Sequence, residues 1–413
     1  MVGAVQQRPA GGRLADPMLW AVLALGITQI IGWGTTHYAL GVLGTPILAE
    51  MGWSRSTVFL GFTVALITGG FASTWIGRLI DMHGGRRIMT IGSALMAVGL
   101  VALAHVKDQA VYLAVWAFLG IAMRMTLYDA AFAALVQVTP TRGRRAISYL
   151  TLFGGLASSI FWPIGHYLAA AVGWREAVLI YAALNAFICL PLHLAGLARR
   201  EAAAAPAAAV GQSANATERQ PLEGRARRIG IALFALIMSL NGFVFGVLSV
   251  LLVSVLESTG LAVATAVWLA SLKGVAQVGG RIVEMFWWRN LHPLTVGRIS
   301  IALLPASILL LLWAGASFPL ALAFTLVMGA SQGILTIVRG AVPLALFGPA
   351  GYGTVLGLIA TPIMLVNALA PTIYAAIIDT WGAEVGEWLL FGCAVLAMLA
   401  MEATALWYWR RRS

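Results

Sequence analysis

Residues 56–105 read STVFLGFTVALITGGFASTWIGRLIDMHGGRRIMTIGSALMAVGLVALAH, which is two long apolar runs joined by a short basic loop. Each run is close to the roughly 20 apolar residues that a helix needs to cross the hydrocarbon core of a bilayer. Backbone groups in lipid must form hydrogen bonds within their own segment, so these runs predict membrane-spanning helices. The alternating segments of about 10 residues that are typical of a membrane barrel are absent from the sequence.

The same pattern of apolar runs and short loops covers the whole chain. Of its 413 residues, 61% are hydrophobic and only 10% are charged, whereas a soluble domain is about 25% charged. We therefore predict an all-α membrane protein of about twelve transmembrane helices, with no soluble domain left over. The predicted spans are 18–48, 56–77, 88–105, 111–138, 146–171, 177–198, 229–256, 264–286, 296–316, 319–345, 353–378 and 386–408.

One polar stretch, 199–228, interrupts the pattern after the sixth span. It holds an Ala-rich run and then polar and basic residues without apolar periodicity, so we expect a mobile linker. The predicted organisation is two six-helix bundles. Its parts are a cytoplasmic tail 1–17, an N-terminal bundle 18–198, the cytoplasmic linker 199–228, a C-terminal bundle 229–409 and a tail 410–413.

Basic residues in the loops predict the orientation. With both termini on the cytoplasmic side, nineteen Lys and Arg fall in cytoplasmic segments and three in periplasmic loops. Loops rich in Lys and Arg stay in the cytoplasm. We predict a multi-pass protein of the inner (plasma) membrane with cytoplasmic termini, and we expect a monomer.

Several function classes find no support in the sequence. The net charge of +11 is spread over short clusters between apolar runs, so we expect no nucleic-acid partner. Two cysteines are too few for a disulfide framework or a metal site. The sequence also lacks a phosphate-binding loop and a dinucleotide-binding turn. We expect no cofactor, no metal and no enzymatic activity, and neither a catalytic cluster nor a sensor domain supports a membrane-embedded enzyme or receptor.

The loop after the second predicted span has a motif of its own. It reads Gly77-Arg-Leu-Ile-Asp81-Met-His-Gly84-Gly-Arg86-Arg87. Glycines permit a tight turn between two spans, and a carboxylate flanked by arginines can form charge-assisted bonds across one face of the protein. The alternative is a basic loop that contains a turn and nothing more.

This motif resembles the signature loop between helices two and three of the major facilitator superfamily, although Met82 stands where an Arg is usual. The resemblance implies two six-helix bundles around a central cavity and alternating access. It also implies that Asp81, Arg86 and Arg87 hold the halves together as a latch in the outward-open state. The stretches 38–56 and 346–357 resemble the monocarboxylate and oxalate/formate branch of that superfamily.

Ionisable residues inside spans are functional candidates by default. In span eight, Lys273, Gln277 and Arg281 are spaced by four residues and therefore share one helix face. That face is expected to line the cavity and bind substrate, or else to form structural ion pairs, with Glu284 neutralising Arg281. The resemblance implies that Arg281 binds a substrate carboxylate; Gln277 stands where animal members of the branch have an Asp.

Other candidates lie in spans one, four and ten. Arg124 resembles the helix-four Arg of the superfamily, with Tyr128 one turn below it. Asp129 should point about 140° away from Arg124 on a continuous helix, and it is a candidate for proton coupling together with Glu284. Arg339 is expected to be structural. Trp33, His37 and Tyr38 of span one could line the cavity. His37 could also titrate, or it could simply pack against its neighbours.

These patterns predict a secondary transporter. Its expected partners are a small organic anion, a proton or counter-anion, and the lipid bilayer. The alternative is a proton-driven exporter of drug-like or amphipathic compounds, with an aromatic cavity and with Arg281 held by Glu284.

Overall fold

The computed structural model describes residues 16–199, 201 and 221–411. The predicted N-terminal tail, most of the predicted linker and the last two residues therefore lie outside the described residues. Every described element is a helix. The first half contains α1 (Pro17–Thr35), α2 (Ala39–Met51), α3 (Arg55–His83), α4 (Gly85–Ala104), α5 (Gln109–Thr126), α6 (Tyr128–Val138), α7 (Gly143–Gly155), α8 (Ala157–Val172), α9 (Trp174–Leu184), the π-helical turn η2 (Asn185–Cys189) and α10 (Leu190–Gly196). The second half contains α11 (Gly224–Val250), α12 (Leu252–Ser258), α13 (Val263–Phe286), α14 (Pro293–Leu312), α15 (Phe318–Phe347), α16 (Tyr352–Trp381) and α17 (Ala383–Arg410).

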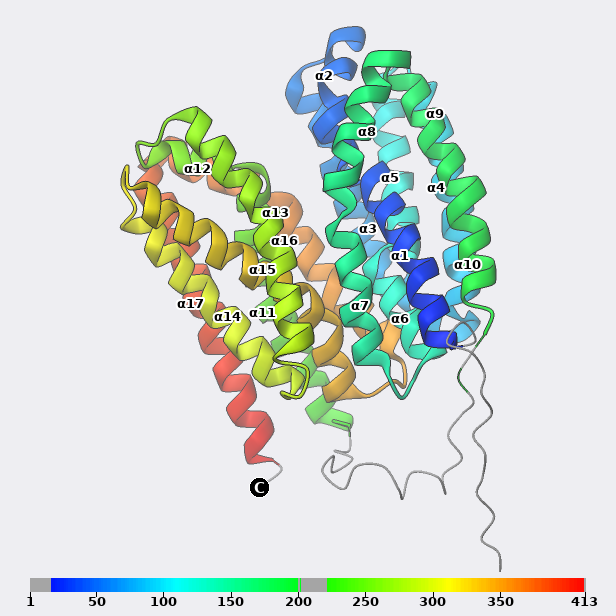
Figure 1. Cartoon of the computed structure of the whole chain (residues 1–413), viewed down its shortest axis with the longest axis vertical. Helices are drawn as coiled ribbons and strands as arrows, with labels where there is room; N and C mark the ends of the chain where they lie inside the picture. The colour runs from blue at the N-terminus through cyan, green and yellow to red at the C-terminus, as the bar shows by residue number, and fades with distance from the viewer. Residues whose placement is uncertain (1–15, 200, 202–220, 412–413) are drawn as a thin grey trace, which may run out of the picture.

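The helices coincide with the twelve predicted spans. Among the described residues, eleven helices or runs of consecutive helices are long and apolar enough to cross a membrane. The remaining long helix is α13, which carries the polar residues predicted to form one face. The all-helical fold is confirmed, with two bundles that lie side by side in Figure 1.

Several spans are broken where a continuous helix was expected. The first is α1 followed by α2, separated at Thr36–Tyr38, and the fourth is α5 followed by α6. At the second break Leu127 has an extended backbone, with φ −83° and ψ −168°. Helix α11 begins at Gly224, earlier than the expected start at 229, so the basic residues of 225–228 lie in its first two turns and not in the linker.

Local sequence explains where the helices start and stop. The Asp16 side chain caps α1 by accepting a hydrogen bond from the backbone N–H of Met18, with Pro17 in the first turn. Gly84 joins α3 to α4 at a φ of +85°, a conformation that favours glycine. The tight turn predicted at this position is therefore present.

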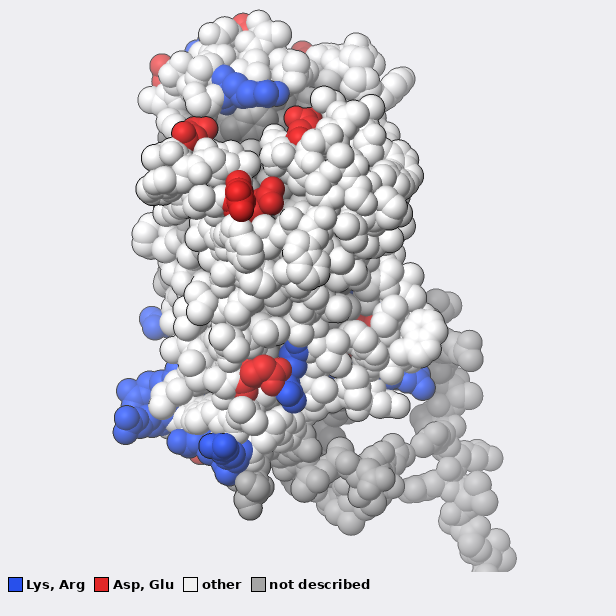
Figure 2. All heavy atoms as spheres, turned by 90° about the vertical axis from the view of Figure 1, so that its left-hand side faces the viewer, with Lys and Arg blue, Asp and Glu red and all other residues white. Residues whose placement is uncertain are grey.

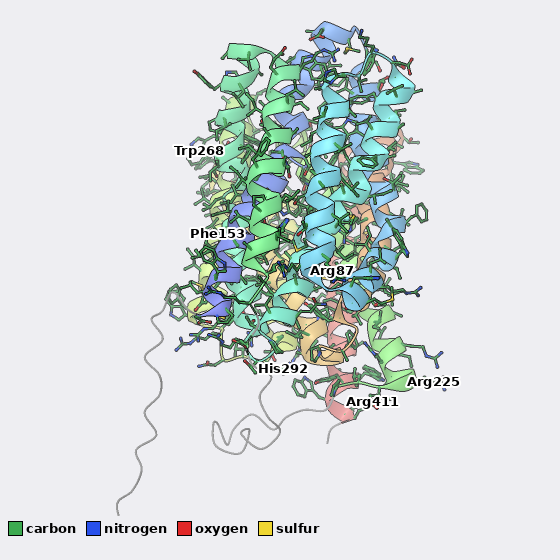
Figure 3. All side chains as sticks on the ribbon, turned by 90° about the vertical axis from the view of Figure 1, so that its right-hand side faces the viewer. Arg87, Phe153, Arg225, Trp268, His292 and Arg411 are labelled. Atoms are coloured by element: carbon green, nitrogen blue, oxygen red, sulfur yellow. The ribbon has the colours of Figure 1, made fainter. Side chains whose placement is uncertain are left out.

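Basic side chains gather at one end of the molecule, which we call the basic face. It is the end at which α3, α6 and α15 stop and α4, α7 and α16 begin, and it carries Arg78, Arg86, Arg87, Arg145, Arg225 and Arg289. Figure 2 shows the blue Lys and Arg side chains concentrated at this end. Figure 3 places Arg225 and Arg411 there, whereas Trp268 lies toward the opposite face.

The two halves are packed together near the basic face. One buried apolar cluster there combines residues of α6 and α7 with Ile337, Ala341, Tyr352 and Leu356 of the second half. Helices α3 and α16 also approach closely, because a Cβ added at Gly357 would lie 2.8 Å from the Thr74 Cα. Toward the opposite face the ribbons diverge, with α2 and α8 packed on the first half and α12 packed on α11 and α13 (Figure 1).

Candidate functional site

Helix α13 holds its polar face in place through close packing on α15. A Cβ added at Gly329 would lie 2.8 Å from the Lys273 carbonyl oxygen, and one added at Gly333 would meet the Gln277 backbone. Small residues let helix backbones approach in this way. Lys273 donates to the Leu248 carbonyl at 3.1 Å and lies 5.4 Å from the Phe245 ring centroid. Lys273 and Gln277 are half-buried, whereas Arg281 is only 5% exposed.

Arg281 binds backbone and hydroxyl oxygens, not a carboxylate. Its Nη1 donates to the Thr151 carbonyl of α7 at 2.9 Å, and its other nitrogens lie 3.4 Å from the Gly333 carbonyl and 3.5 Å from the Thr336 hydroxyl. Among the described residues, no carboxylate forms an ion pair with it. The expected alternative, an Arg281–Glu284 pair, is wrong.

Glu284 turns to the other half of the molecule. One oxygen accepts from Arg144 Nη2 at 3.0 Å and the other from the Ser148 hydroxyl at 3.0 Å, and both partners belong to α7. Arg144 also donates to the Leu291 carbonyl at 2.5 Å. Glu284 is 2% exposed. Glu284 therefore does not pair with Arg281, although the two residues are only three positions apart on α13. Two donors of α7 already satisfy its carboxylate.

The Thr151 carbonyl is where Arg281 meets the aromatic residues of the first half. The Tyr128 hydroxyl donates to the same oxygen at 3.3 Å. Gly154 and Gly155 end α7 here, and a Cβ at either position would collide with Tyr128 or with Arg281. The glycine pair in the middle of span five is the sequence signal that could have identified this binding position for Arg281, which was not predicted.

The predicted aromatic residues form one cluster around Tyr128. Its ring centroid lies 5.2 Å from that of Trp33, which in turn lies 4.8 Å from His37 and 6.4 Å from Tyr38. Phe62, which was not predicted, adds a contact at 4.8 Å from His37. The structure thus brings Trp33, His37, Tyr38 and Tyr128 together beside Arg281, and leaves Lys273 and Gln277 further along α13.

Arg124 lies in a separate group of charges. It forms an ion pair with Asp129, which also accepts from Arg339 Nη2 of α15 at 2.6 Å. The expectation that Asp129 turns away from Arg124 is wrong, because the extended backbone at Leu127 breaks the helix between them. Arg124 and Asp129 are 7% and 6% exposed, and Arg339 makes the expected structural contact.

Asp81 joins the halves at the basic face. Its carboxylate accepts hydrogen bonds from the backbone N–H groups of Gly353 and Thr354, at 2.9 and 2.7 Å, and from the Thr354 hydroxyl at 2.6 Å. These groups form the first turn of α16, where an anion is favoured by the helix dipole. Gly77 gives α3 the room it needs, since a Cβ there would collide with the Gly353 backbone.

The two latch arginines do not join the halves among the described residues. Arg86 Nε donates to the Leu194 carbonyl of α10 at 2.7 Å, within the first half. Arg87 lines a shallow hollow with Thr90 and Leu194, also in the first half. The turn at Gly84 directs both side chains toward α10 and away from α16, so their predicted contact with the second half is not formed.

Comparisons with known proteins agree with this architecture. The sequence model of the Major Facilitator Superfamily matches residues 18–314. Among curated proteins, an "Uncharacterized 38 kDa protein in 23S RNA operon" of Thermoproteus tenax is 27% identical over 178 residues, which is 43% of this chain and 46% of that protein. The "Uncharacterized MFS-type transporter YcxA" of Bacillus subtilis (strain 168) is 22% identical over 194 residues, 45% of this chain and 46% of that protein. The chain therefore matches about half the length of these curated relatives.

Two solved structures share the fold over most of the chain. The human organic anion transporter MFSD10 (TETRAN) superposes with a TM-score of 0.73 at 17% identity, covering 94% of this chain and 100% of that one. The proton:xylose symporter XylE superposes with a TM-score of 0.69 at 14% identity, covering 94% and 95%. With a family match over most of its length and with this helical architecture, the chain belongs to the Major Facilitator Superfamily.

Proposed function

We propose that the protein is a secondary active transporter that moves a small organic anion, of monocarboxylate type, by alternating access coupled to a proton. The observation that carries the proposal is the buried Arg281 guanidinium, which has no carboxylate partner among the described residues. A buried cation is costly unless it is paired. A substrate carboxylate would supply the missing charge in the planar, two-pronged geometry that guanidinium favours.

The surroundings of Arg281 fit an anion with a short apolar body. Tyr128 and Trp33 offer ring surfaces, and the Tyr128 hydroxyl bonds the same carbonyl as Arg281. Lys273 lies eight residues earlier, about 12 Å along the same helix face, so it would attract an anion more weakly and at longer range. We infer that Trp33, His37, Tyr38, Tyr128 and Gln277 line the substrate site, with Arg281 at its base.

We propose that the basic face is cytoplasmic and that the structure represents an outward-facing state. The loop charges support this orientation. The contacts between halves that are described above, made by Asp81, Asp129, Glu284 and Arg281, lie from the middle of the molecule to the basic face. Opening that face would break these contacts, and Asp81 would lose its hydrogen bonds to the first turn of α16.

Glu284 is the better candidate for proton coupling. Its partners Arg144 and Ser148 both belong to α7, so separation of the halves would leave its carboxylate unpaired. Asp129 would lose Arg339 but keep Arg124, which lies in its own half. We infer that separation of the halves at the basic face frees the Glu284 carboxylate, and that this loss of partners is the step that ties Glu284 to coupling.

The test is binding of small carboxylates to purified protein. Arg281→Lys keeps the charge but loses the fork, so we expect affinity to fall at least about tenfold, which corresponds to one charge-assisted hydrogen bond of roughly 1.5–3 kcal/mol. Arg281→Gln should abolish binding. Arg298→Lys is the matched control, because Arg298 is held by Glu402 at 2.6 Å on α14 and α17 and should leave binding unchanged.

Two outcomes would redirect the proposal. Equal affinity in wild type and Arg281→Lys, with equal thermal stability, would remove Arg281 from the anion site. The aromatic cluster also favours a second candidate, an exporter of amphipathic compounds by proton antiport. Transport that is insensitive to competing small carboxylates would support that exporter, because a cavity for neutral or cationic compounds should not respond to them.

A further inference from the structure

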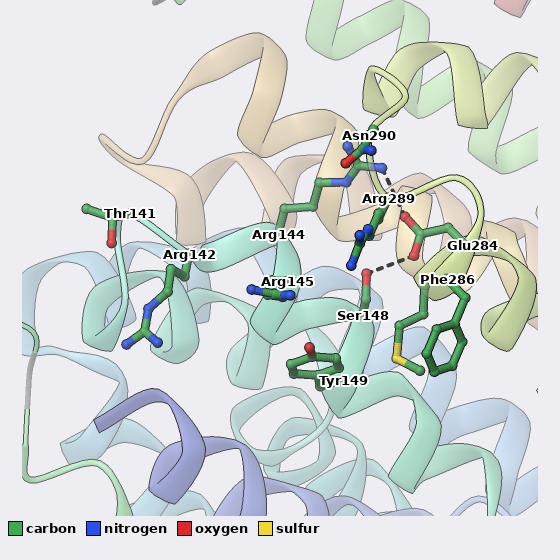
Figure 4. A pocket seen from close by; sticks show the side chains of 11 residues that line it. Thr141, Arg142, Arg144, Arg145, Ser148, Tyr149, Glu284, Phe286, Arg289 and Asn290 are labelled. Atoms are coloured by element: carbon green, nitrogen blue, oxygen red, sulfur yellow. Dashed lines mark hydrogen bonds and ion pairs between the residues drawn. The ribbon is translucent and has the colours of Figure 1, made fainter. Parts of the chain in front are cut away.

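A cavity of about 640 Å³ lies between the two halves at the basic face, apart from the substrate site. One wall is the first two turns of α7, and the other is the end of α13 with the loop that follows it (Figure 4). Its lining residues are Thr141, Arg142, Arg144, Arg145, Ser148, Tyr149, Glu284, Met285, Phe286, Arg289 and Asn290. The proposed substrate transport uses Glu284 and Arg144 of this set and leaves the rest without a role.

The single carboxylate of the cavity is already neutralised. Both oxygens of Glu284 are used, one by Arg144 and the other by Ser148 (dashed lines in Figure 4). Arg144 is further fixed by the Leu291 carbonyl at 2.5 Å and the Trp288 carbonyl at 3.3 Å. This pair therefore forms the floor of the cavity and contributes little net charge.

The other arginines leave an excess of positive charge. Arg142 is satisfied, because it donates to Asp16 at 2.6 Å and to Glu201 at 2.5 Å. Arg145 and Arg289 are exposed, and neither forms an ion pair with a described carboxylate. Figure 4 shows both side chains in the space between α7 and the end of α13. Two unpaired guanidinium groups on opposite walls suit an anion that lies between them.

Aromatic side chains adjoin the cavity. Arg145 lies 5.9 Å from the centroid of the Tyr149 ring on the same wall. Phe286 and Trp287 end α13 side by side, with ring centroids 6.2 Å apart, and are 61% and 72% exposed. Large aromatic side chains at the end of a membrane-spanning helix mark the lipid headgroup level. The charged cavity therefore lies at the depth of phospholipid headgroups.

We propose that this cavity binds the phosphate-bearing headgroup of an anionic phospholipid, with Arg145 and Arg289 on the phosphate and Phe286 beside the glycerol and acyl region. Basic pockets between membrane helices are suited to anionic headgroups. The bound lipid bridges α7 of the first half and the α13–α14 loop of the second half. It therefore favours the state in which the basic face is closed, beside the Arg144–Glu284 contact.

The test is native mass spectrometry of the full-length protein in detergent, titrated with phosphatidylglycerol or phosphatidylcholine. We expect phosphatidylglycerol to bind preferentially, and the double variant Arg145→Gln/Arg289→Gln to bind it on the order of tenfold or more weakly. Arg145→Lys/Arg289→Lys should retain most binding. The control Arg225→Gln/Arg228→Gln removes the same charge from exposed positions of α11 on the same face and should bind like wild type.

Inorganic phosphate and glycerol 3-phosphate separate a lipid from a free anion. If either competes fully with phosphatidylglycerol at equal concentration, the ligand is a soluble phosphate and the lipid assignment is wrong. Equal loss of lipid in the control variant would mean general attraction to the basic face and would overturn the site. Spin labels on α7 and on the α13–α14 loop test the bridge. Phosphatidylglycerol should shorten their mean distance in wild type, and an unchanged distance would refute the closing effect.

Discussion

The charges buried between the halves differ in where their partners come from. Asp129 has one arginine in its own half and one in the other, whereas Glu284 depends wholly on α7. Arg281 has no charged partner among the described residues and reaches across to a backbone carbonyl. The proposed rocking of the halves would therefore change the surroundings of these three residues in three different ways, as the proposed coupled transport requires.

Asp81→Asn should weaken the closed basic face without unfolding the protein. The amide keeps an oxygen for one N–H group of α16 but loses the charge that the helix N-terminus favours, a change of roughly 1–2 kcal/mol. We expect transport to fall and a cysteine placed in the α7–α13 cavity to react about fivefold faster or more. Thr354→Val is the control, because it removes only the hydroxyl donor and should have a smaller effect. Normal transport and unchanged reactivity in Asp81→Asn would reduce this loop to a turn.

Asp16 should make stability depend on acid pH. The hydrogen bonds that Arg142 donates to the Asp16 carboxylate hold the pKa of Asp16 below its ordinary value, and the same bonds raise the pKa of Arg142. A lowered carboxyl pKa adds stability that is present above the ordinary value of about 3.9 and is lost as the pH falls through the folded value. The unfolding temperatures of wild type and Asp16→Asn should therefore differ at pH 7, and the difference should shrink as the pH falls toward 3.

The double variant Asp16→Asn/Arg142→Gln is the check on this pair. If Asp16 acts through Arg142, the double variant should lose less unfolding free energy than the sum of the losses in the two single variants. A difference between wild type and Asp16→Asn that stays constant from pH 7 to pH 3 would instead assign the effect to the helix cap alone.

Among the helices, the pair α3 and α16 is held by small residues. Gly357→Ala would place a Cβ 2.8 Å from the Thr74 Cα, and because the neighbours are backbone atoms the two helices must move apart. We expect a lower unfolding temperature and weaker closure of the basic face. Gly392→Ala on α17 is the control, since its Cβ would meet no atom within 4 Å and the change should be neutral. Equal effects of the two substitutions would show that close approach of α3 and α16 is not required.

The helices could be predicted from sequence because long apolar runs leave the backbone no alternative in lipid. Their breaks could not, since Leu127 has an ordinary apolar side chain that does not mark its extended backbone. The error over Asp129 follows directly from that break. The shared face of α13 was predictable from spacing, whereas the Arg144–Glu284 contact joins residues 140 positions apart and nothing in the local sequence marks it.

At the scale of the whole molecule, orientation is open to a direct test. Reporter fusions at residues 210 and 413 should both report a cytoplasmic location, because the basic face carries the loop arginines. A fusion after Gly173, in the turn between α8 and α9, serves as the control and should report the opposite side. A periplasmic report from residue 210 or 413 would reverse the proposed direction of opening.

The polar face of α13 has a further consequence for how the protein is made. A Lys or Arg at the centre of an isolated helix costs roughly 2.5–3.5 kcal/mol during insertion, and α13 carries Lys273 near its middle and Arg281 further on. Its packing partner α15, which offers Gly329 and Gly333, leaves the ribosome only later. We therefore expect α13 to wait at the translocon until α14 and α15 emerge and to enter the bilayer together with them.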